Sequence, residues 1–537
     1  MKKKGQTASP AMHFVRIADT RIVRPTDETT FRLRLEAHNH VLQAFPPARY
    51  TETKKVNAIL QRAFEFYSVR LGRLLEQLAS RDFIQCILLQ YDESVRIGHG
   101  DTLVPIEREF WRASGPQFRR ALKHLCEKAS SVALRVDSDL TQARSVKFFN
   151  QALLCAEEMV NLYHLSETTY SLFPDDIELQ LSERFFDCTL QASRAHLLSR
   201  FVKMVEDDRD NQSKFIKGLT FDTDPPAQCA VLDPYFYRAF GISFGHFLDF
   251  LRHAVDDPTP DPNGLPIPFI NLERFVEAGS KLGIEPELVR KILMGFTLRK
   301  TAMRQEGRVM WNPKQKHRAL RRAFFEFPHP EGTHLVWSRG MAKESFVWLL
   351  SGACFQQLPD EWINDETRVG LAAVSNACGE WFERVASDNL RNVGFKGQAY
   401  NGHVRVGQEV LAIPDSVGQL DFLGYNSAER LLLLAEFKMV EEGTEPRFYR
   451  DAIAQFVRNK VNYADKFRRK IAWVTENREH LAGMFLPGSG SVRLASVMIT
   501  LYPCFASFFI DDFPCVSITH FRLDYQRKSG WPYPLTA

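Results

Sequence analysis

The most restrictive feature of the sequence is a run of nine residues, Leu431 to Met439, that is apolar except for Glu436 and Lys438. A segment this short and this apolar predicts a strand that is buried on both faces. Because side chains alternate along a strand, Glu436 and Lys438 should share one face, with Phe437 on the other. Burying a carboxylate and an ammonium group is costly, so this end of the strand needs a pairing partner, a metal or a substrate.

A second carboxylate is expected beside the first. Residues 418–425 predict another strand and residues 426–430 a polar turn, so a hairpin would bring Asp421 alongside Glu436. Two adjacent carboxylates repel each other unless a cation lies between them. Oxygen ligands without a nearby His or Cys favour Mg²⁺ or Mn²⁺ over zinc, and Lys438 could orient or deprotonate a water or offset charge on a phosphate oxygen. These residue types, in this order, suit metal-assisted phosphodiester hydrolysis.

The same residues match a known pattern. Asp421, Glu436 and Lys438 have the spacing D-x14-E-x-K, and Gly379-Glu-Trp-Phe-Glu383 fits a G-x-x-[FW]-E pattern on the preceding predicted helix. Together they resemble the core of the PD-(D/E)XK nucleases, the restriction-endonuclease-like superfamily. The resemblance covers about residues 366–530, roughly a third of the chain.

The resemblance implies a function and a role for each residue. Asp421 and Glu436 would be metal ligands, joined by the backbone carbonyl of Phe437, and Lys438 would be the catalytic lysine. Glu383 would be the catalytic, helix-borne acid that completes or supports the metal site. The expected activity is that of a Mg²⁺-dependent (or Mn²⁺-dependent) nuclease acting on nucleic acid, with DNA favoured over RNA and with endonuclease and exonuclease action both open. A further hypothesis is a component of a larger assembly, such as an antiviral defence or repair system, that is active only with its partner.

Several alternatives stay open at this point. Pro414-Asp415 also spells the acidic motif, but it lies in an expected turn and ranks second to Asp421. Glu380, one helical turn before Glu383, could replace it. Some exonuclease members add Q-x-x-x-Y on the next helix, whereas here Gln455 is followed at that spacing by asparagine, so Gln455 is only an additional candidate. The acid–lysine set could also be a buried ion pair in an inactive nuclease fold that acts as a nucleic-acid-binding or scaffold component.

The pattern of apolar residues predicts an α+β multidomain chain. A mainly α-helical N-terminal region should precede a C-terminal α/β restriction-endonuclease-like domain with a mixed central sheet flanked by helices. The expected ranges are an irregular segment over 1–50, a helical domain over 51–255, a helical and basic region over 256–358, and the nuclease-like domain over 359–537.

Two stretches carry most of the positive charge. The chain as a whole has a net charge of only +4, yet residues 299–322 hold nine Lys or Arg against one Glu, and residues 446–470 hold eight against two Asp. The second stretch predicts a long basic helix directly after the carboxylate-bearing strand. Such stretches suit phosphate contact, although a solvated face is the common alternative. The residues expected to bind nucleic acid are Arg299, Lys300, Arg304, Arg308, Lys314, Lys316, Arg318, Arg321, Arg322, Arg458 and Lys460.

Residues 275–294 have the spacing of a helix-turn-helix, with small residues at Ala278 and Gly279 and a turn at Gly283. A plain helical hairpin needs the same pattern, and Glu285 and Glu287 would repel phosphate.

The N-terminal region is expected to bind substrate or a partner protein. A homodimer would suit the cutting of both strands of a duplex. No nucleotide-binding P-loop motif occurs.

The remaining features bear on the compartment. The nine cysteines are scattered, with no two within four positions, which favours reduced thiols and gives no cysteine-based zinc site. Neither a secretory signal nor a membrane-spanning run is recognised, so a cytoplasmic location is expected.

Overall fold

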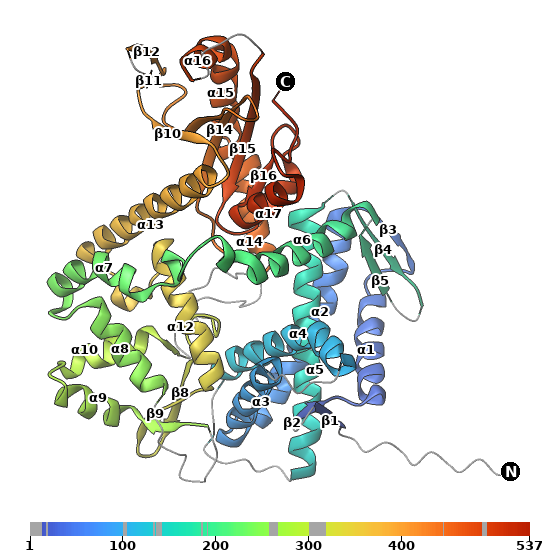
Figure 1. The fold of residues 1–537 in the computed structure, drawn as a ribbon. Coiled ribbons are helices and arrows are strands. Elements are labelled where there is room, and N and C mark those ends of the chain that lie inside the picture. The colour runs from blue at the N-terminus through green and yellow to red at the C-terminus, as the bar shows by residue number, and fades with distance from the viewer. Residues whose placement is uncertain are drawn as a thin grey trace. The chain divides into compact units, whose positions relative to one another are not determined.

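The computed structural model describes residues 13–17, 20–99, 105–132, 135, 142–174, 176–183, 186–190, 192–256, 267–299, 318–406, 408–443, 445–485 and 491–536. As predicted, the chain is α+β, with a mainly helical N-terminal region and mixed sheets (Figure 1). It divides into two units, residues 1–189 with 225–371, and residues 190–224 with 372–537. In the described part of the chain, no helix has both the length and the apolarity that crossing a membrane requires.

The first unit is mostly helical and carries three small sheets, β1-β2, β3-β4-β5 and β6-β9-β8-β7. Its helices are α1 (Asp27–Leu42), α2 (Thr53–Leu78), α3 (Arg81–His99), α4 (Pro105–Ser130), α5 (Gln142–Glu167), η1 (Thr168–Leu172), α7 (Pro225–Phe240), α8 (Phe244–Val255), α9 (Leu272–Lys281), α10 (Pro286–Gly295), α12 (Arg339–Cys354) and η5 (Asp360–Trp362). Its strands are β1 (His13–Ile17), β2 (Thr20–Arg24), β3 (Ala48–Tyr50), β4 (Ile177–Leu181), β5 (Phe186–Leu190), β6 (Phe269–Asn271), β7 (Thr297–Leu298), β8 (Phe324–His329) and β9 (Gly332–Val336).

Helix α1 lies inside the segment that the sequence predicted to be irregular. The Thr26 side chain caps it by accepting a hydrogen bond from the Thr29 amide, and acidic residues stand in its first turn. Only four of its 16 residues are buried, so the face that it packs against the protein is narrow. The capping residue was therefore a better indicator of this helix than its hydrophobic periodicity.

The predicted pair of short helices at residues 275–294 is present as α9 and α10. Gly279 lies where the helices cross, and a Cβ there would come within 2.3 Å of the Val289 side chain. Gly283 forms the turn with a φ of +77°, a conformation that favours glycine. Leu282 is 71% exposed, because it lies in the turn before the second helix begins.

The second unit contains one five-stranded sheet and one small hairpin, β11-β12. Its helices are α6 (Ala192–Asn211), η2 (Gln212–Lys214), η3 (Phe221–Thr223), α13 (Asp365–Arg391, which begins in the first unit), α14 (Pro446–Ile453), η6 (Ala454–Arg458), α15 (Tyr463–Glu476), α16 (Arg478–Phe485), η7 (Phe505–Phe509) and α17 (Ile518–Lys528). Its strands are β10 (Lys396–Tyr400), β11 (His403–Val406), β12 (Glu409–Ala412), β13 (Leu420–Asn426), β14 (Leu431–Lys438), β15 (Arg493–Thr500) and β16 (Cys515–Ser517).

The five-stranded sheet is mixed, with the order β10-β13-β14-β15-β16. Strands β10, β13 and β14 pair antiparallel, and β14, β15 and β16 pair parallel. The long connection from β14 to β15, made of α14, η6, α15 and α16, is what a parallel pair requires. Strand β14 is therefore central, and its end at Lys438 is the point where the chain leaves the sheet.

The predicted hairpin is present as β13 and β14. Asn426 closes it, because its side-chain oxygen accepts hydrogen bonds from the amides of Ala428 and Glu429. The register pairs Phe422 with Ala435 and Asn426 with Leu431. This register brings the start of β13 beside the end of β14.

One face of the sheet forms the core with α13 and α17. The residues of β14 at alternate positions, including Leu433 and Phe437, pack with Phe382 and Leu390 of α13 and with Phe521 of α17. Because alternate side chains point to opposite faces, Glu436 and Lys438 lie on the face that does not meet this cluster. The helix α15 lies against β14 on that side, as the ion pairs described below indicate.

The basic stretch 446–470 forms two helices rather than the single long helix that was expected. The helix that starts at Pro446 ends after η6, and Asn462 begins α15 by accepting a hydrogen bond from the Asp465 amide at 2.8 Å. Asparagine at this position stabilises a new helix start, which explains the break.

Residues 190–224 pack in the second unit, although the sequence-based range 51–255 groups them with the helical region. Phe201 of α6 makes edge contacts with Tyr449 and Phe505, and Ser517 donates a 2.6 Å hydrogen bond to Asp208. An amphipathic helix has the same apolar face whichever unit it packs against, so its periodicity alone does not identify that unit.

We expect Asp208→Asn to stabilise the protein above pH 6. Burial raises the pKa of Asp208 from 3.8 to about 6, so between these values the folded chain binds more protons and its stability falls as the pH rises. The gain in the free energy of unfolding should reach about 2–3 kcal/mol at about pH 8 and vanish below about pH 4. Urea unfolding at several pH values measures it.

Asp210→Asn is the matched control, because Asp210 lies on the same helix and is exposed. Its stability should follow the wild type at every pH. Equal stability of Asp208→Asn and the wild type at pH 8 would contradict the expected burial of an ionised carboxylate.

A pair of facing glycines joins β10 to β13. Gly397 and Gly424 are register partners, and a Cβ on Gly424 would lie 2.6 Å from the Phe422 ring and 2.8 Å from backbone atoms of the facing strand. We expect Gly424→Ala to lower the free energy of unfolding by about 1–3 kcal/mol, because backbone must move to make room. Gly379→Ala in α13 meets nothing within 4 Å and should instead stabilise by up to about 1 kcal/mol. Urea unfolding of both variants would show whether their effects have opposite signs.

Candidate active site

Asp421 lies near the start of β13 and is only 7% exposed. Its Oδ2 atom accepts a 2.9 Å hydrogen bond from the backbone amide of Phe437, on the neighbouring strand. This bond fixes the carboxylate against the end of β14, beside Glu436, which is 3% exposed. The hairpin therefore brings together the two carboxylates that the sequence predicted to be neighbours.

Lys438, the last residue of β14, contacts both carboxylates. Its Nζ atom lies 2.7 Å from Glu436 Oε1 and 3.5 Å from Asp421 Oδ2, and it donates a 2.9 Å hydrogen bond to the Phe437 carbonyl. Burial alone would lower the pKa of Lys438, but the charges of Glu436 and Asp421 raise it to about 12. The ammonium group is therefore charged at neutral pH.

A second lysine, which sequence reasoning missed, completes this cluster. Lys470 of α15 is 7% exposed, and its Nζ atom lies 2.5 Å from Glu436 Oε2 and 3.8 Å from Asp421 Oδ1. The sequence offered a signal, because Lys470 has helical spacing with the buried residues Phe467 and Val474. The surrounding basic stretch hides this signal, because a buried, paired lysine and a solvated one have the same local pattern.

Glu383 of α13 lies near enough to interact electrostatically with the cluster. Burial raises the pKa of its carboxyl group, and the negative charges of Asp421 and Glu436 raise it further, against the opposite effect of Lys438. Glu380, one turn away, is exposed and adds a smaller effect of the same sign.

Glu383 does not, however, form a tight three-carboxylate group with Asp421 and Glu436. Across the described ranges, the one set of three His, Cys, Asp or Glu side chains with ligand atoms within 4.8 Å of one another lies elsewhere, at the tip of the β8–β9 hairpin.

The other candidates of the second unit stand outside the cluster. Asp415, the alternative acid, is exposed in a turn between β12 and β13. Gln455 is exposed in η6. Arg458 and Lys460 are exposed as well, and the Arg458 guanidinium lies 5.8 Å from the ring centroid of Phe509. Both basic residues keep the exposure that contact with a phosphate requires.

Within the described residues, the arginines of the basic stretch 299–322 pair with side chains of the first unit. Five of its candidates, Lys300, Arg304, Arg308, Lys314 and Lys316, lie outside the described residues. Arg322 is 1% exposed and makes two hydrogen bonds to Glu361, at 3.0 and 2.9 Å, and Arg299 pairs with the same carboxylate at 2.6 Å.

The two remaining arginines of this stretch are also engaged within the first unit. Arg318 pairs at 2.8 Å with Glu127, which is fully buried, and Arg321 donates a hydrogen bond to Gln357. For Arg322 the prediction of nucleic-acid contact is wrong, because its charge is buried and paired inside the unit. Arg318 is paired as well, with 11% of its side chain exposed.

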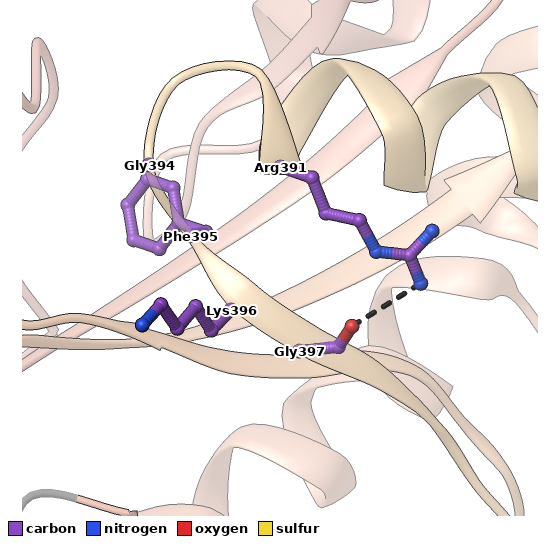
Figure 2. A pocket seen from close by; sticks show the side chains of 5 residues that line it. All are labelled: Arg391, Gly394, Phe395, Lys396 and Gly397. Atoms are coloured by element: carbon purple, nitrogen blue, oxygen red, sulfur yellow. Dashed lines mark hydrogen bonds between the residues drawn. The ribbon is translucent and has the colours of Figure 1, made fainter.

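An open concavity of about 440 Å³ in the second unit lies away from the carboxylates. Figure 2 shows its lining, in which the Arg391 guanidinium reaches the Gly397 carbonyl at 3.3 Å and the Lys396 side chain extends away from that contact. Lys396 is the register partner of Tyr425, near the turn of the hairpin, whereas Asp421 stands at the opposite end of β13. We therefore assign it no part in the candidate active site.

The geometry groups two buried carboxylates with two ammonium groups at the end of the central strand. Each of the four carboxylate oxygens has a lysine Nζ within 4.0 Å. No family model, curated protein or solved structure matched this chain in the three comparisons made.

Proposed function

We propose that the second unit is a metal-dependent nuclease that hydrolyses phosphodiester bonds, with Asp421, Glu436 and Lys438 as its central residues. One observation carries the proposal: two carboxylates from adjacent strands are buried together at the end of β14, with the Lys438 ammonium group in contact with both. The mixed sheet flanked by helices agrees with the architecture that the sequence resemblance implies. The buried acids are costly to keep unless they perform chemistry or are fully paired.

The residues present suit Mg²⁺ or Mn²⁺. Asp421, Glu436 and the Phe437 carbonyl supply oxygen atoms, which are the ligands that hard divalent cations prefer. Two ammonium groups now contact these oxygens, so a divalent ion would have to displace the lysine contacts in order to bind. A divalent ion held there would lower the pKa of a bound water and polarise a phosphate oxygen.

Lys438 and Lys470 would have separate tasks. The charge on Lys438, whose pKa lies above its ordinary value, suits it to offset negative charge that develops on a phosphate rather than to remove a proton. Lys470 lies deeper, against Glu436 Oε2, and would hold that carboxylate in place. Burial and the charges of Asp421 and Glu436 raise the pKa of the Glu383 carboxyl group, which would suit it to donate a proton.

A second candidate function is favoured by one specific observation. Lys438 and Lys470 together balance the charges of Asp421 and Glu436, so the four groups form a neutral network without any metal. Such a network suits a nuclease-fold protein that binds nucleic acid or a partner protein without cutting. It predicts salt-dependent binding but no cleavage.

A cleavage assay with the full chain separates the two functions. Single- and double-stranded DNA and RNA, as linear and circular substrates, are incubated with Mg²⁺, with Mn²⁺ and with a chelator. Metal-dependent cleavage of any substrate supports the nuclease, and the circular substrates distinguish endonuclease from exonuclease activity. Binding that weakens with salt, together with intact substrates in both metals, supports the second function instead.

A further inference from the structure

The β8–β9 hairpin of the first unit presents three side chains that ligate metals. His329 ends β8, Glu331 lies in the connection, and His334 follows on β9. The register pairs His329 with Gly332 and Phe327 with His334, so both histidines lie on the same face of the hairpin. Their ligand atoms and that of Glu331 lie within 4.8 Å of one another.

His334 is held in one orientation with a nitrogen available for ligation. It is only 7% exposed and stacks on the ring of Phe269, with 4.6 Å between the ring centroids and 21° between their planes. Its Nδ1 atom lies 3.1 Å from the Gly332 carbonyl. A carbonyl only accepts hydrogen bonds, so Nδ1 carries the proton and Nε2 keeps its lone pair, as in histidines that bind metals through Nε2.

The loop that carries Glu331 is also held in place. The Asn271 side chain donates a 2.8 Å hydrogen bond to the Glu331 carbonyl, and the same Asn271 caps the start of α9. The backbone amide of Glu331 donates to His329 Nδ1 across 3.3 Å, so Nδ1 is the unprotonated nitrogen of this ring, and a metal ion bound there would replace that long hydrogen bond. The carboxylate of Glu331 is exposed to solvent and adds the negative charge that favours a cation.

We propose that His329, Glu331 and His334 bind one divalent transition-metal ion of the zinc class. Two imidazoles and one carboxylate suit Zn²⁺, whereas Mg²⁺ prefers oxygen ligands alone. Three protein ligands leave a position for water in a tetrahedral site, and the exposed Glu331 side makes that position accessible. This site is separate in its residues from the Asp421–Glu436 cluster and does not depend on the proposed nuclease function.

Titration of the full chain with ZnCl₂ by isothermal calorimetry tests the proposal. Wild type should bind Zn²⁺ at this site. The variants His329→Ala and Glu331→Gln should each weaken that binding by more than about 10-fold, because changing a residue that only supports a metal ligand already costs at least that much. His329 is part-exposed and Glu331 is exposed, so both variants are expected to fold, which thermal unfolding without metal checks. Co²⁺ titration should give an absorption spectrum in wild type that both variants lose.

Two controls make the result specific. His403→Ala removes an exposed histidine of β11, and Asp421→Asn alters the other candidate metal site, so both should bind Zn²⁺ as wild type does. If the wild type shows no saturable Zn²⁺ binding, the proposal is overturned. It is also overturned if His329→Ala and Glu331→Gln bind Zn²⁺ as tightly as His403→Ala does. Loss of binding only in Asp421→Asn would also overturn it, because the Zn²⁺ would then belong to the carboxylate cluster.

Discussion

Lys438→Met is expected to lower the rate of metal-dependent cleavage by roughly 10²–10³-fold. This is the typical loss when an enzyme loses one fixed group that stabilises the charge of the transition state. The lysine contacts Asp421, Glu436 and the Phe437 carbonyl, so its charge sits where a phosphate would meet the carboxylates. Methionine keeps the length and much of the volume of the side chain but removes the charge. Single-turnover cleavage with saturating Mg²⁺ measures the effect.

The binding of Mn²⁺ then separates the lysine from the metal ligands. Lys438→Met should still bind Mn²⁺, because both carboxylates remain, whereas Glu436→Gln should lose both Mn²⁺ binding and cleavage. Lys217→Met, which removes an exposed lysine of the second unit outside both basic stretches, is the matched control and should cleave within a few-fold of wild type. Undiminished cleavage by Lys438→Met would remove this lysine from the mechanism.

Arg322→Met is expected to destabilise the first unit by about 3–5 kcal/mol, the usual cost of removing one partner of a buried ion pair. Arg322 is 1% exposed, makes two hydrogen bonds to Glu361, and donates to the Met294 carbonyl at 3.0 Å. Without the guanidinium, the largely buried Glu361 carboxylate loses two hydrogen bonds and keeps the one from Arg299, and the Met294 carbonyl loses its donor. Thermal or urea unfolding of the full chain, followed by a probe in the first unit, measures the loss.

The stability lost in Arg322→Met should also depend on pH. Burial alone would raise the pKa of Glu361, but the bonds from Arg322 bring it below its ordinary value of 4.5. The ion pair therefore stabilises the protein above about pH 4.5 and is lost as the pH falls, so the penalty of Arg322→Met should shrink in acid. Arg252→Met removes one partner of an exposed pair with Asp249 and should cost at most about 1 kcal/mol. Weaker nucleic-acid binding by Arg322→Met at unchanged stability would contradict the structural role.

The parts of the fold that follow local patterns could be predicted from the sequence. The apolar run that ends in Glu436 and Lys438, the polar turn before it and the helix that carries Glu383 all depend on residues close in sequence. Side-chain alternation and a short turn then determine which side chains become neighbours, so Asp421 and Glu436 were expected together. The hydrogen bond from the Phe437 amide to Asp421 is a direct consequence of that register.

Features that depend on distant partners could not be predicted in the same way. Lys470 and Arg322 both stand in basic stretches, where a buried, paired charge has the same local pattern as a solvated one. Their partners, Glu436 and Glu361, lie 34 and 39 positions away. The grouping of Phe201 and Asp208 with the second unit depends on contacts across more than 240 positions, which periodicity does not encode. The two histidines of the β8–β9 hairpin are five positions apart, and only the pairing of the two strands brings them to the same face.

The central claim is tested most directly by the cleavage rates of two variants, Asp421→Asn and Asp415→Asn, on the same nucleic acid in Mg²⁺. Both substitutions remove one carboxylate charge, but Asp421 is buried against Lys438 whereas Asp415 is exposed in a turn. We expect Asp415→Asn to cleave as wild type does and Asp421→Asn to be slower by about 10²-fold or more. Equal rates for the two variants would contradict the assignment of the site to Asp421, Glu436 and Lys438.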